Sequence, residues 1–455
     1  MKLLRGLLML AIASTLGANP PAQADEGMWV FNNLPTELLK KKYGFEPSDA
    51  WIKHLQLSAV RFNSGGSGSF VSPDGLVMTN HHVGADTLQK ISTKERNYYK
   101  TGFHARSRAE EVKAPDLELN VVVNIEDVTE QVTSRVTPEM SDADAETARR
   151  KAIAEIEKAA TDRNKLRNDV VKLYQGGQYH LYTYKVYTDV RMVFAPEFDI
   201  AFFGGDPDNF EYPRYCLDVC FFRAYENDQP AKVEHYLRWS PHGSQNGDLV
   251  FVAGNPGRTS RLNTLAHLEY LRDTAFPLQL DFLANKEAFL QKYSERGEEQ
   301  ARQAKEYLFG IQNSLKARRG GLGGLKDPAF MTRKQAGERA LRERLSADAD
   351  RGKVYGPAWD RIAGAEKKAA EILKPYNFIE RGLAFDTELF SIARVLVRLA
   401  QEDAKPNSDR LREYQEAGRR SLELMLYSSA PVYPEFETAK LANSLEYWKT
   451  IMPDD

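Results

Sequence analysis

The stretch that constrains the fold most strongly is residues 66–82, with the sequence GSGSFVSPDGLVMTNHH. Two short apolar runs, at 69–71 and 76–79, flank Ser72-Pro73-Asp74-Gly75. Proline at the second position and glycine at the fourth are typical of a type I turn. The stretch therefore predicts a β-hairpin, and the pair His81-His82 follows directly after its second strand.

A histidine at the end of a strand can act as a general base, because the scaffold is rigid and the ordinary pKa of histidine is near neutral. A His-His pair alone is weak evidence for that role, since core and surface histidines are commoner. An orienting carboxylate is also needed. Asp218 lies in an apolar stretch that predicts a strand, and a buried carboxylate needs a partner. That partner is His82, or Arg214 or Arg223 nearby.

Strand patterns dominate residues 50–270. Period-2 alternation predicts a strand from Val186 to Phe194, and Leu217–Tyr225 and Leu249–Ala253 are further strand candidates. One helical insertion is expected near 141–173, because Ser141–Leu173 is rich in Ala, Glu, Lys and Arg, with Ser141 as the N-cap.

Beyond about residue 270 the pattern becomes helical. Leu278, Phe282, Phe289 and Tyr293 recur at helical spacing, and Tyr307, Ile311 and Leu315 continue it. The glycines at 320–324 are expected to break the helix. The sequence thus predicts a β-rich domain over 25–270 and an all-α domain over 271–455.

Composition excludes several classes of function. The 455 residues carry 62 Lys and Arg against 64 Asp and Glu, which argues against a nucleic-acid partner. Hydrophobic residues make up 42%, enough for large cores. The histidines show no metal-ligand spacing and the diglycines lack a phosphate-loop pattern, so we expect no metal and no cofactor. Cys216 and Cys220, four positions apart on one predicted strand, are too distant to form a disulfide; we expect two small core thiols, although their state is not fixed by the sequence.

The first 24 residues have the three parts of a secretory signal peptide. Lys2 and Arg5 precede the apolar run Leu7–Leu16, and Ala22-Gln23-Ala24 fits the cleavage site. The apolar run is too short to span a bilayer, and no later run is long enough. We therefore expect an exported protein, periplasmic or secreted, that begins near Asp25 and has no membrane span.

The hairpin resembles the one that leads to the catalytic histidine of trypsin-like serine peptidases, in which that histidine directly precedes a Cys or Val; this points to His82. The sequence as a whole resembles the bacterial family of dipeptidyl-peptidases 7 and 11, trypsin-like serine exopeptidases with an inserted helical domain. The resemblance covers most of residues 25–320 and rests on these segments: Asp25–Trp29, Thr79–Val83, Phe194–Glu197, Phe202–Phe210, the strand with Asp218, and Gly254–Thr259.

The family implies a trypsin-like β-barrel peptidase domain, here its first barrel and flanking elements, followed by an all-α helical domain. It implies a serine-type dipeptidyl peptidase that releases dipeptides from oligopeptides with a free N-terminus. His82 matches the catalytic histidine and Asp218 the catalytic aspartate. Asn209, in the pair Asn209-Phe210, and Asn313 match the residues that bind the substrate α-amino group.

Each assignment has a plainer reading. Asn313 could be a solvated helix residue, and Asn209 could cap the turn begun at Asp206. A homodimer is an assembly consistent with the resemblance.

The departure from the family pattern is the nucleophile. No Gly-Asn-Ser-Gly-Ser-Pro-like loop follows Asp218, and the chain ends at Asp455 within the expected helical domain, which we therefore expect to be truncated. Ser67 and Ser260 are poor substitutes, so the nucleophile is unknown and the specificity for the residue before the cleaved bond cannot be predicted. The alternatives are a non-catalytic, truncated peptide-binding product and a trypsin-like chaperone-protease relative, which the helical region disfavours.

Overall fold

The computed structural model describes residues 27–93, 95–257 and 259–452. The expected signal peptide at 1–24 lies outside the described residues, as does Arg258 of the segment 254–259. The described chain forms two compact units. The first comprises the residues up to Ile52 together with Trp239–Val252, and it contains α2 (Thr36–Tyr43) and the start of α3 (Asp49–Ser58). Everything that follows concerns the second unit, unless stated.

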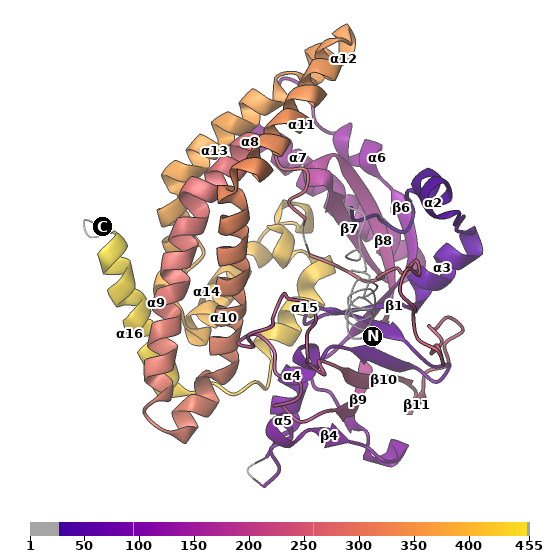
Figure 1. Cartoon of the computed structure of the whole chain (residues 1–455), viewed down its shortest axis with the longest axis vertical. Coiled ribbons are helices and arrows are strands. Elements are labelled where there is room, and N and C mark those ends of the chain that lie inside the picture. Colours follow the sequence, from indigo (N-terminus) through magenta and orange to yellow (C-terminus); the bar gives the residue numbers. More distant parts are fainter. Residues whose placement is uncertain (1–26, 94, 258, 453–455) are drawn as a thin grey trace, which may run out of the picture. The chain divides into compact units, whose positions relative to one another are not determined.

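An antiparallel sheet organises the first half of the second unit (Figure 1). Neighbouring strands follow in the order β4, β9, β10, β3, β2, β1, β6, β8 and β7, while β5 pairs with β9 and β11 with β10. The strands are β1 (Ala59–Phe62), β2 (Ser67–Phe70), β3 (Leu76–Thr79), β4 (Phe103–His104), β5 (Val112–Lys113), β6 (Leu119–Asp127), β7 (Arg167–Leu173), β8 (Gln178–Tyr187), β9 (Asp189–Ala195), β10 (Cys220–Glu226) and β11 (Gln229–Pro230). The short helices α4 (His81–Ile91), α5 (Tyr98–Thr101) and α6 (Thr129–Thr133) lie between strands in the sequence.

The predicted hairpin is confirmed. β2 and β3 pair with Phe70 opposite Val77, and both side chains are buried in the main core of the sheet. Gly75 has a φ of +69°, and a Cβ there would lie 2.9 Å from the Ala224 carbonyl oxygen. Glycine is therefore required at the turn, because an L-residue would be strained and would collide with β10.

Three strand predictions need correction. The stretch Val186–Phe194 is two strands, β8 and β9, separated by the exposed Thr188. The buried side chains are at an odd position, Tyr187, before the bend and at an even position, Val190, after it. The sequence pattern did not reveal this change. β10 begins three residues later than expected, at Cys220, and Leu249–Ala253 forms no strand. In the first unit Phe251 instead packs against aromatic rings of the segment 45–51.

The helical insertion is shorter than predicted. α7 spans Asp142–Asn164, and the Ser141 hydroxyl caps it by accepting the Asp144 N–H at 3.2 Å. Lys165 then adopts a φ of +58° and ends the helix. The rest of the predicted helix is the strand β7, in which β-branched Val170 and Val171 pair with β8.

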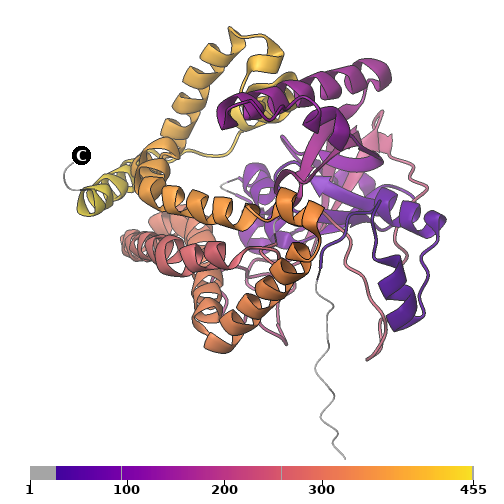
Figure 2. The ribbon, with the colours of Figure 1, turned by 90° about the horizontal axis from the view of Figure 1, so that it is seen from above.

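Helices make up the second half of this unit: α8 (Leu265–Tyr270), α9 (Phe276–Ser294), α10 (Glu298–Lys326), α11 (Pro328–Ser346), α12 (Ala349–Tyr355), α13 (Ala358–Pro375), α14 (Glu388–Asp403), α15 (Glu416–Leu426) and α16 (Pro434–Ile451). α9 and α10 lie side by side (Figure 1) and share a core that includes Leu290, Tyr293, Ile311 and Leu315. α7 lies beside the segment that carries α15 (Figure 2), where Arg412 contacts Glu157.

The expected break at the glycines was wrong, because α10 continues through 320–324 to Lys326. A glycine costs a helix only about 1 kcal/mol relative to alanine. Gly321 also has a packing reason, since a Cβ there would lie 3.2 Å from the ring of Phe276 on α9. Among the helices in the described residues, none is long and apolar enough to cross a membrane.

Candidate active site

Strand register brings together residues that are far apart in the sequence. β3 and β10 are antiparallel, with Thr79 opposite Cys220. Asn80 follows β3 and precedes the first turn of α4, while Asp218 lies just before β10. The register therefore places Asp218 beside the start of α4, although it lies 136 positions from His82. We expected Asp218 inside the strand, but it lies just before β10 begins.

His82 and Asp218 form a hydrogen-bonded pair. The Nδ1 of His82 lies 2.8 Å from Oδ2 of Asp218, close to the separation of about 3 Å expected for a base and its orienting group. The backbone N–H of His82 donates to Oδ1 at 3.1 Å, and the Asn80 amide donates to Oδ2 at 3.1 Å. Because the carboxylate accepts at Nδ1, the proton belongs on Nδ1 and Nε2 is left free to accept.

Electrostatics favour the ionised form of Asp218. Burial on its own would raise the pKa of this carboxyl, because its side chain is only 11% exposed. The hydrogen bonds that His82 donates, together with its favourable electrostatic interaction with the carboxylate, outweigh that effect, so the pKa of Asp218 lies below its ordinary value. The two arginines considered as alternative partners are engaged elsewhere: Arg214 with Asp206 at 2.8 Å and Arg223 with Glu111 at 3.0 Å.

Two further residues hold the histidine, and the sequence did not reveal either role. The ring of Phe203 stacks on the His82 ring, with centroids 4.1 Å apart and planes at 16°. The guanidinium group of Arg214 in turn lies over the Phe203 ring, 5.2 Å from its centroid. His81 is buried, its ring is bonded to the Pro196 carbonyl, and burial lowers its pKa. His81 is therefore a neutral packing neighbour, and its Nε2 has no hydrogen-bond partner among the described residues.

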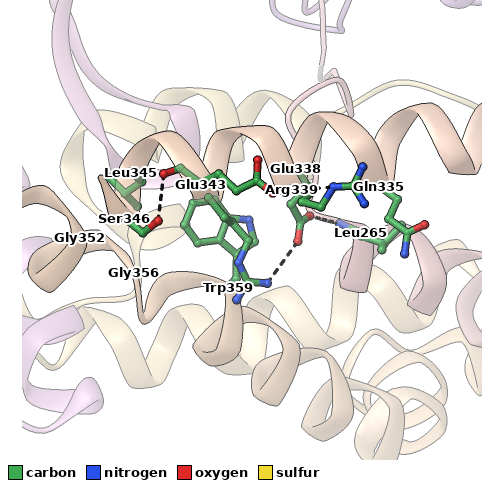
Figure 3. Close-up of a pocket in the computed structure, with 11 residues that line it drawn as sticks. Leu265, Gln335, Glu338, Arg339, Glu343, Leu345, Ser346, Gly352, Gly356 and Trp359 are labelled. Atoms are coloured by element: carbon green, nitrogen blue, oxygen red, sulfur yellow. Dashed lines mark hydrogen bonds and ion pairs between the residues drawn. The ribbon is translucent and has the colours of Figure 1, made fainter. Parts of the chain in front are cut away.

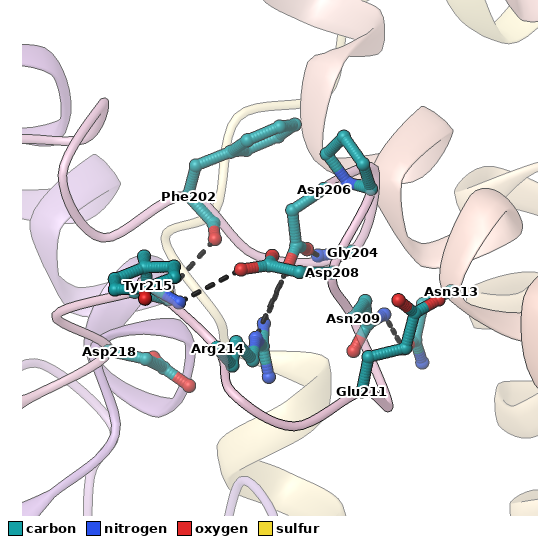
Figure 4. A network of polar contacts seen from close by, with 12 residues as sticks. Phe202, Gly204, Asp206, Asp208, Asn209, Glu211, Arg214, Tyr215, Asp218 and Asn313 are labelled. Carbon is teal, nitrogen blue, oxygen red and sulfur yellow. Dashed lines mark hydrogen bonds and ion pairs between the residues drawn. The ribbon is translucent and has the colours of Figure 1, made fainter. Parts of the chain in front are cut away.

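The other predicted residues form a second pair. Asn209 is 1% exposed, and its Nδ2 donates to Oδ1 of Asn313 on α10 at 2.8 Å (Figure 4). Phe210 does not line a closed site: it is 62% exposed and has a φ of +64°. Asn209 also takes part in the turn, because its backbone N–H donates to the Asp206 carbonyl at 3.3 Å.

The loop between the two pairs is braced internally. The Asp206 carboxylate accepts from the Gly204 N–H at 2.7 Å and from Arg214, and the Asp208 carboxylate accepts from the Tyr215 N–H at 2.8 Å (Figure 4). A cavity of about 390 Å³ opens beside this loop, lined by Asp199, Ile200, Phe202, Asp206, Pro207, Asp208 and Tyr215. Both cysteines are free thiols; Cys220 is buried as expected and Cys216 only partly.

The larger cavity, about 560 Å³, lies away from these residues, among α8, α11, α12 and α13 (Figure 3). Its charged lining is largely satisfied within the protein. Glu338 accepts the Leu265 N–H at 2.7 Å, and Arg342 lies over the ring of Trp359. Residues 27–93, 95–257 and 259–452 contain no group of three or more His, Cys, Asp or Glu side chains arranged to hold a metal ion.

Within the described residues, neither Ser67 nor Ser260 forms a hydrogen bond with His82. The Ser67 hydroxyl accepts the Asn255 N–H at 2.6 Å. A Cβ on Gly254 would lie 2.8 Å from the Ser67 hydroxyl, so the segment beginning at Gly254 packs closely on β2. These contacts give Gly254 and Asn255 a structural role.

Comparison with known proteins identifies the family. The model of the family Peptidase S46 matches residues 24–455. The chain belongs to the Peptidase S46 family. This S46 chain is 30% identical over 419 residues to the dipeptidyl-peptidase 7 of Porphyromonas endodontalis, covering 87% of the chain and 50% of that protein. It is 31% identical over 414 residues to the Asp/Glu-specific dipeptidyl-peptidase of Shewanella putrefaciens, covering 87% and 55%.

The fold of the S46 chain also matches a solved structure. The crystal structure of Porphyromonas endodontalis DPP11 in complex with the dipeptide Arg-Glu superimposes with a TM-score of 0.72 at 24% identity, covering 94% of this chain and 64% of that one. The S46 chain spans about half the length of these curated relatives.

Proposed function

We propose that this protein functions as a serine-type dipeptidyl peptidase, which releases dipeptides from the free N-terminus of oligopeptides. The observation that carries the proposal is the loop 203–218. It leads from the ring beneath His82, past Asn209 and its bond to Asn313, to Asp218 at 2.8 Å from His82. The base therefore contacts both ends of one braced loop, at Phe203 and at Asp218, and the polar pair is attached between them at Asn209.

The His82–Asp218 pair has the chemistry of a general base. His82 would take the proton of the attacking hydroxyl at Nε2 and later give it to the leaving amine. Asp218 would hold the tautomer and stabilise the imidazolium. The His82 side chain is 40% exposed, so Nε2 can be reached from outside.

The Asn209–Asn313 pair suits a substrate ammonium group. An α-ammonium offers three donors and a positive charge, and an amide oxygen accepts through two lone pairs. Oδ1 of Asn313 uses one lone pair on Asn209, and Oδ1 of Asn209 can accept from the substrate. Phe210, being exposed, could contact the first side chain of a bound peptide.

The finer architecture and location are part of the same proposal. We propose that the sheet belongs to a trypsin-like barrel, that residues 25–270 form this peptidase domain, and that 271–455 belong to a helical domain. The leader over 1–24 would export the protein to the periplasm or beyond. A homodimer is a further expectation from the resemblance.

The nucleophile is not assigned to any serine of this sequence. We therefore predict that the isolated chain binds peptides without cleaving them, because a nucleophile and an oxyanion hole supply several kcal/mol of the rate acceleration. The test is to assay the purified chain with a panel of dipeptidyl-coumarin substrates. Turnover that disappears in His82→Ala would show that a serine of this chain, such as Ser67, is the nucleophile.

Binding in that same experiment separates the proposal from its alternative. A chain that binds a free dipeptide more tightly than the N-acetylated dipeptide keeps the amine-reading site, whether or not it cleaves. A chain that shows neither binding nor turnover contradicts both the peptidase proposal and a non-catalytic peptide-binding product.

A further inference from the structure

The ring of His82 is fixed by two different kinds of contact. Its hydrogen bond to Asp218 holds one atom, Nδ1, at 2.8 Å, but a single bond leaves the ring free to swing about that atom. The stack on Phe203, with ring planes at 16°, fixes the plane of the ring as well. The direction in which Nε2 of His82 points therefore depends on Phe203.

Phe203 needs support of its own. Its side chain is only partly buried, and it lies in a loop rather than in a strand or a helix. The guanidinium group of Arg214 lies over the Phe203 ring, 5.2 Å from its centroid. A cation over an aromatic face is attracted to the ring, so Arg214 favours this one orientation of Phe203.

Arg214 is itself held by Asp206. Its Nε and Nη2 both donate to Oδ2 of Asp206, at 3.1 and 2.8 Å (Figure 4). The Asp206 side chain is only 6% exposed, so this charge-assisted bond is largely shielded from water. A planar guanidinium group can lie over a ring and donate hydrogen bonds at the same time, a combination that the compact ammonium group of lysine does not reproduce.

Asp206 also holds the turn that carries Asn209. The Asp206 carbonyl accepts the Asn209 N–H at 3.3 Å. Beside this bond, the Asp208 carboxylate accepts the N–H of Tyr215, the residue after Arg214, at 2.8 Å. The turn around Asn209 and the segment that carries Arg214 are therefore joined into one hydrogen-bonded unit.

We propose that Arg214 is a positioning residue that links the amine-reading turn to the base. Through Asp206 it steadies the turn of Asn209. Through Phe203 it sets the plane of the His82 ring, and with it the direction of Nε2. The inference rests on the proposed function, because it concerns one residue that serves both the binding of the ammonium group and the transfer of the proton.

Two variants of the full chain cut the two links separately. Arg214→Met keeps the length of the side chain but removes its charge and its hydrogen bonds, so both links are lost. Phe203→Leu removes only the stack and leaves the bond between Arg214 and Asp206 in place. Arg223→Met is the matched control, because Arg223 is also partly buried and pairs with a buried carboxylate, Glu111 at 3.0 Å, but lies on β10.

The NMR signals of the His82 ring report its stacking without any substrate. Protons held over a phenyl ring are shielded, so the stack predicts ring signals of His82 that are displaced upfield. The chain has eight histidines, and His82→Ala identifies the signals that belong to this one. Phe203→Leu should abolish the displacement and Arg214→Met should remove most of it, whereas Arg223→Met should keep it.

The double variant tests the route of the effect. If Arg214 acts on His82 through Phe203, Arg214→Met changes the His82 signals no further once Phe203 is leucine. An additional change of the same size in the double variant would overturn the proposal, and so would His82 signals in Arg214→Met that match those in Arg223→Met. Should the methionine variant not fold, Arg214→Lys takes its place and should remove the displacement in part, since lysine keeps the charge and loses the planar fork.

Peptide binding tests the other link. Arg214→Met should weaken the binding of Arg-Glu by about 2- to 30-fold, the usual range for residues that couple sites without touching the ligand. Phe203→Leu should keep the preference for Arg-Glu over N-acetyl-Arg-Glu, because the bonds of Asn209 are intact in that variant. An Arg-Glu affinity in Arg214→Met that equals the affinity in Arg223→Met would overturn the link to Asn209.

Failure of the proposed function would give a different result. Equal binding of the free and acetylated dipeptides by the unaltered chain would remove the amine-reading role. The His82 signals of the single and double variants are measured without peptide, so they would still decide whether Arg214 positions the base.

Discussion

Replacing Asn209 by alanine tests the proposed amine-reading site directly. Asn209 is 1% exposed, and its Nδ2 donates to Oδ1 of Asn313 at 2.8 Å. Alanine removes this bond and the side-chain oxygen that Asn209 can offer to an ammonium group. It also leaves an amide oxygen of Asn313 without its partner.

The expected loss in affinity for a free dipeptide is about 1.5–3 kcal/mol, the range for a hydrogen bond to a charged group. This corresponds to about 10- to 150-fold in Kd. An acetylated dipeptide has no ammonium group, so its weaker binding should change by less than about twofold. The free energy of unfolding should also fall, by about 1–3 kcal/mol, because a buried acceptor loses its donor.

The assay is an NMR titration with Arg-Glu and N-acetyl-Arg-Glu, together with urea unfolding of the same samples. Asn168→Ala is the matched control. Asn168 is also 1% exposed, and its Nδ2 donates to Oδ1 of Asn164 at 2.9 Å. The Asn168 side chain also bonds to Thr161, Leu166 and Thr183, so this control should lose at least as much stability and yet keep its preference for the free amine.

Equal losses on the free and acetylated dipeptides would refute the reasoning. They would mean that Asn209 acts through the turn, in which its N–H bonds to the Asp206 carbonyl. A preference that survives in Asn209→Ala would also refute it, since the ammonium group would then be read elsewhere.

Two further predictions concern stability. The pKa of Asp218 lies below its ordinary value of 3.8, so its carboxylate stabilises the fold above that pH and the contribution is lost as pH falls through the lower, folded value. Asp218→Asn should therefore lower the free energy of unfolding by about 1.5–3 kcal/mol at neutral pH, and a urea-measured difference that persists unchanged well below pH 3.8 would contradict this. Gly320→Ala should stabilise α10 by about 0.5–1 kcal/mol, because a Cβ there meets nothing within 4 Å. Gly321→Ala should stabilise α10 less or destabilise it, because its Cβ would meet the ring of Phe276. Equal gains in the free energy of unfolding, measured in urea, would show that the contact with Phe276 has no cost.

The sequence pattern correctly predicted those elements that depend on residues close together in the chain. The turn at 72–75, the Ser141 cap and the apolar face of α9 each depend on residues a few positions apart. The errors arose where tertiary packing decides. The strand pattern does not show the bend at Thr188, and the sequence does not show that the Phe276 ring needs a glycine beside it at 321.

The candidate site shows the same division. The hairpin pattern leads to the pair His81-His82, and the resemblance to trypsin-like peptidases selects His82. The pairing of His82 with Asp218 depends on the register of β3 with β10, which the sequence pattern did not give. The pattern singled out Asp218 but left its partner open, and the family resemblance pointed to His82; the asparagine pair came from the resemblance alone. Phe203 lay inside a segment that we singled out, yet its stacking on His82 had no sequence signal of its own.

The braced loop explains how such a site could measure a dipeptide. Two extended residues span about 7 Å, so an exopeptidase of this kind must hold its amine-reading group at a set distance from its base. Here the ring beneath His82 and the buried Asn209 are six positions apart on one loop, and the Asp206 carboxylate ties that loop to Arg214 and to the Gly204 N–H. The distance is therefore set by bonds within the loop, and α10 adds a second constraint through Asn313. Under the proposed function a longer substrate end would have to displace these bonds, which would favour the release of dipeptides.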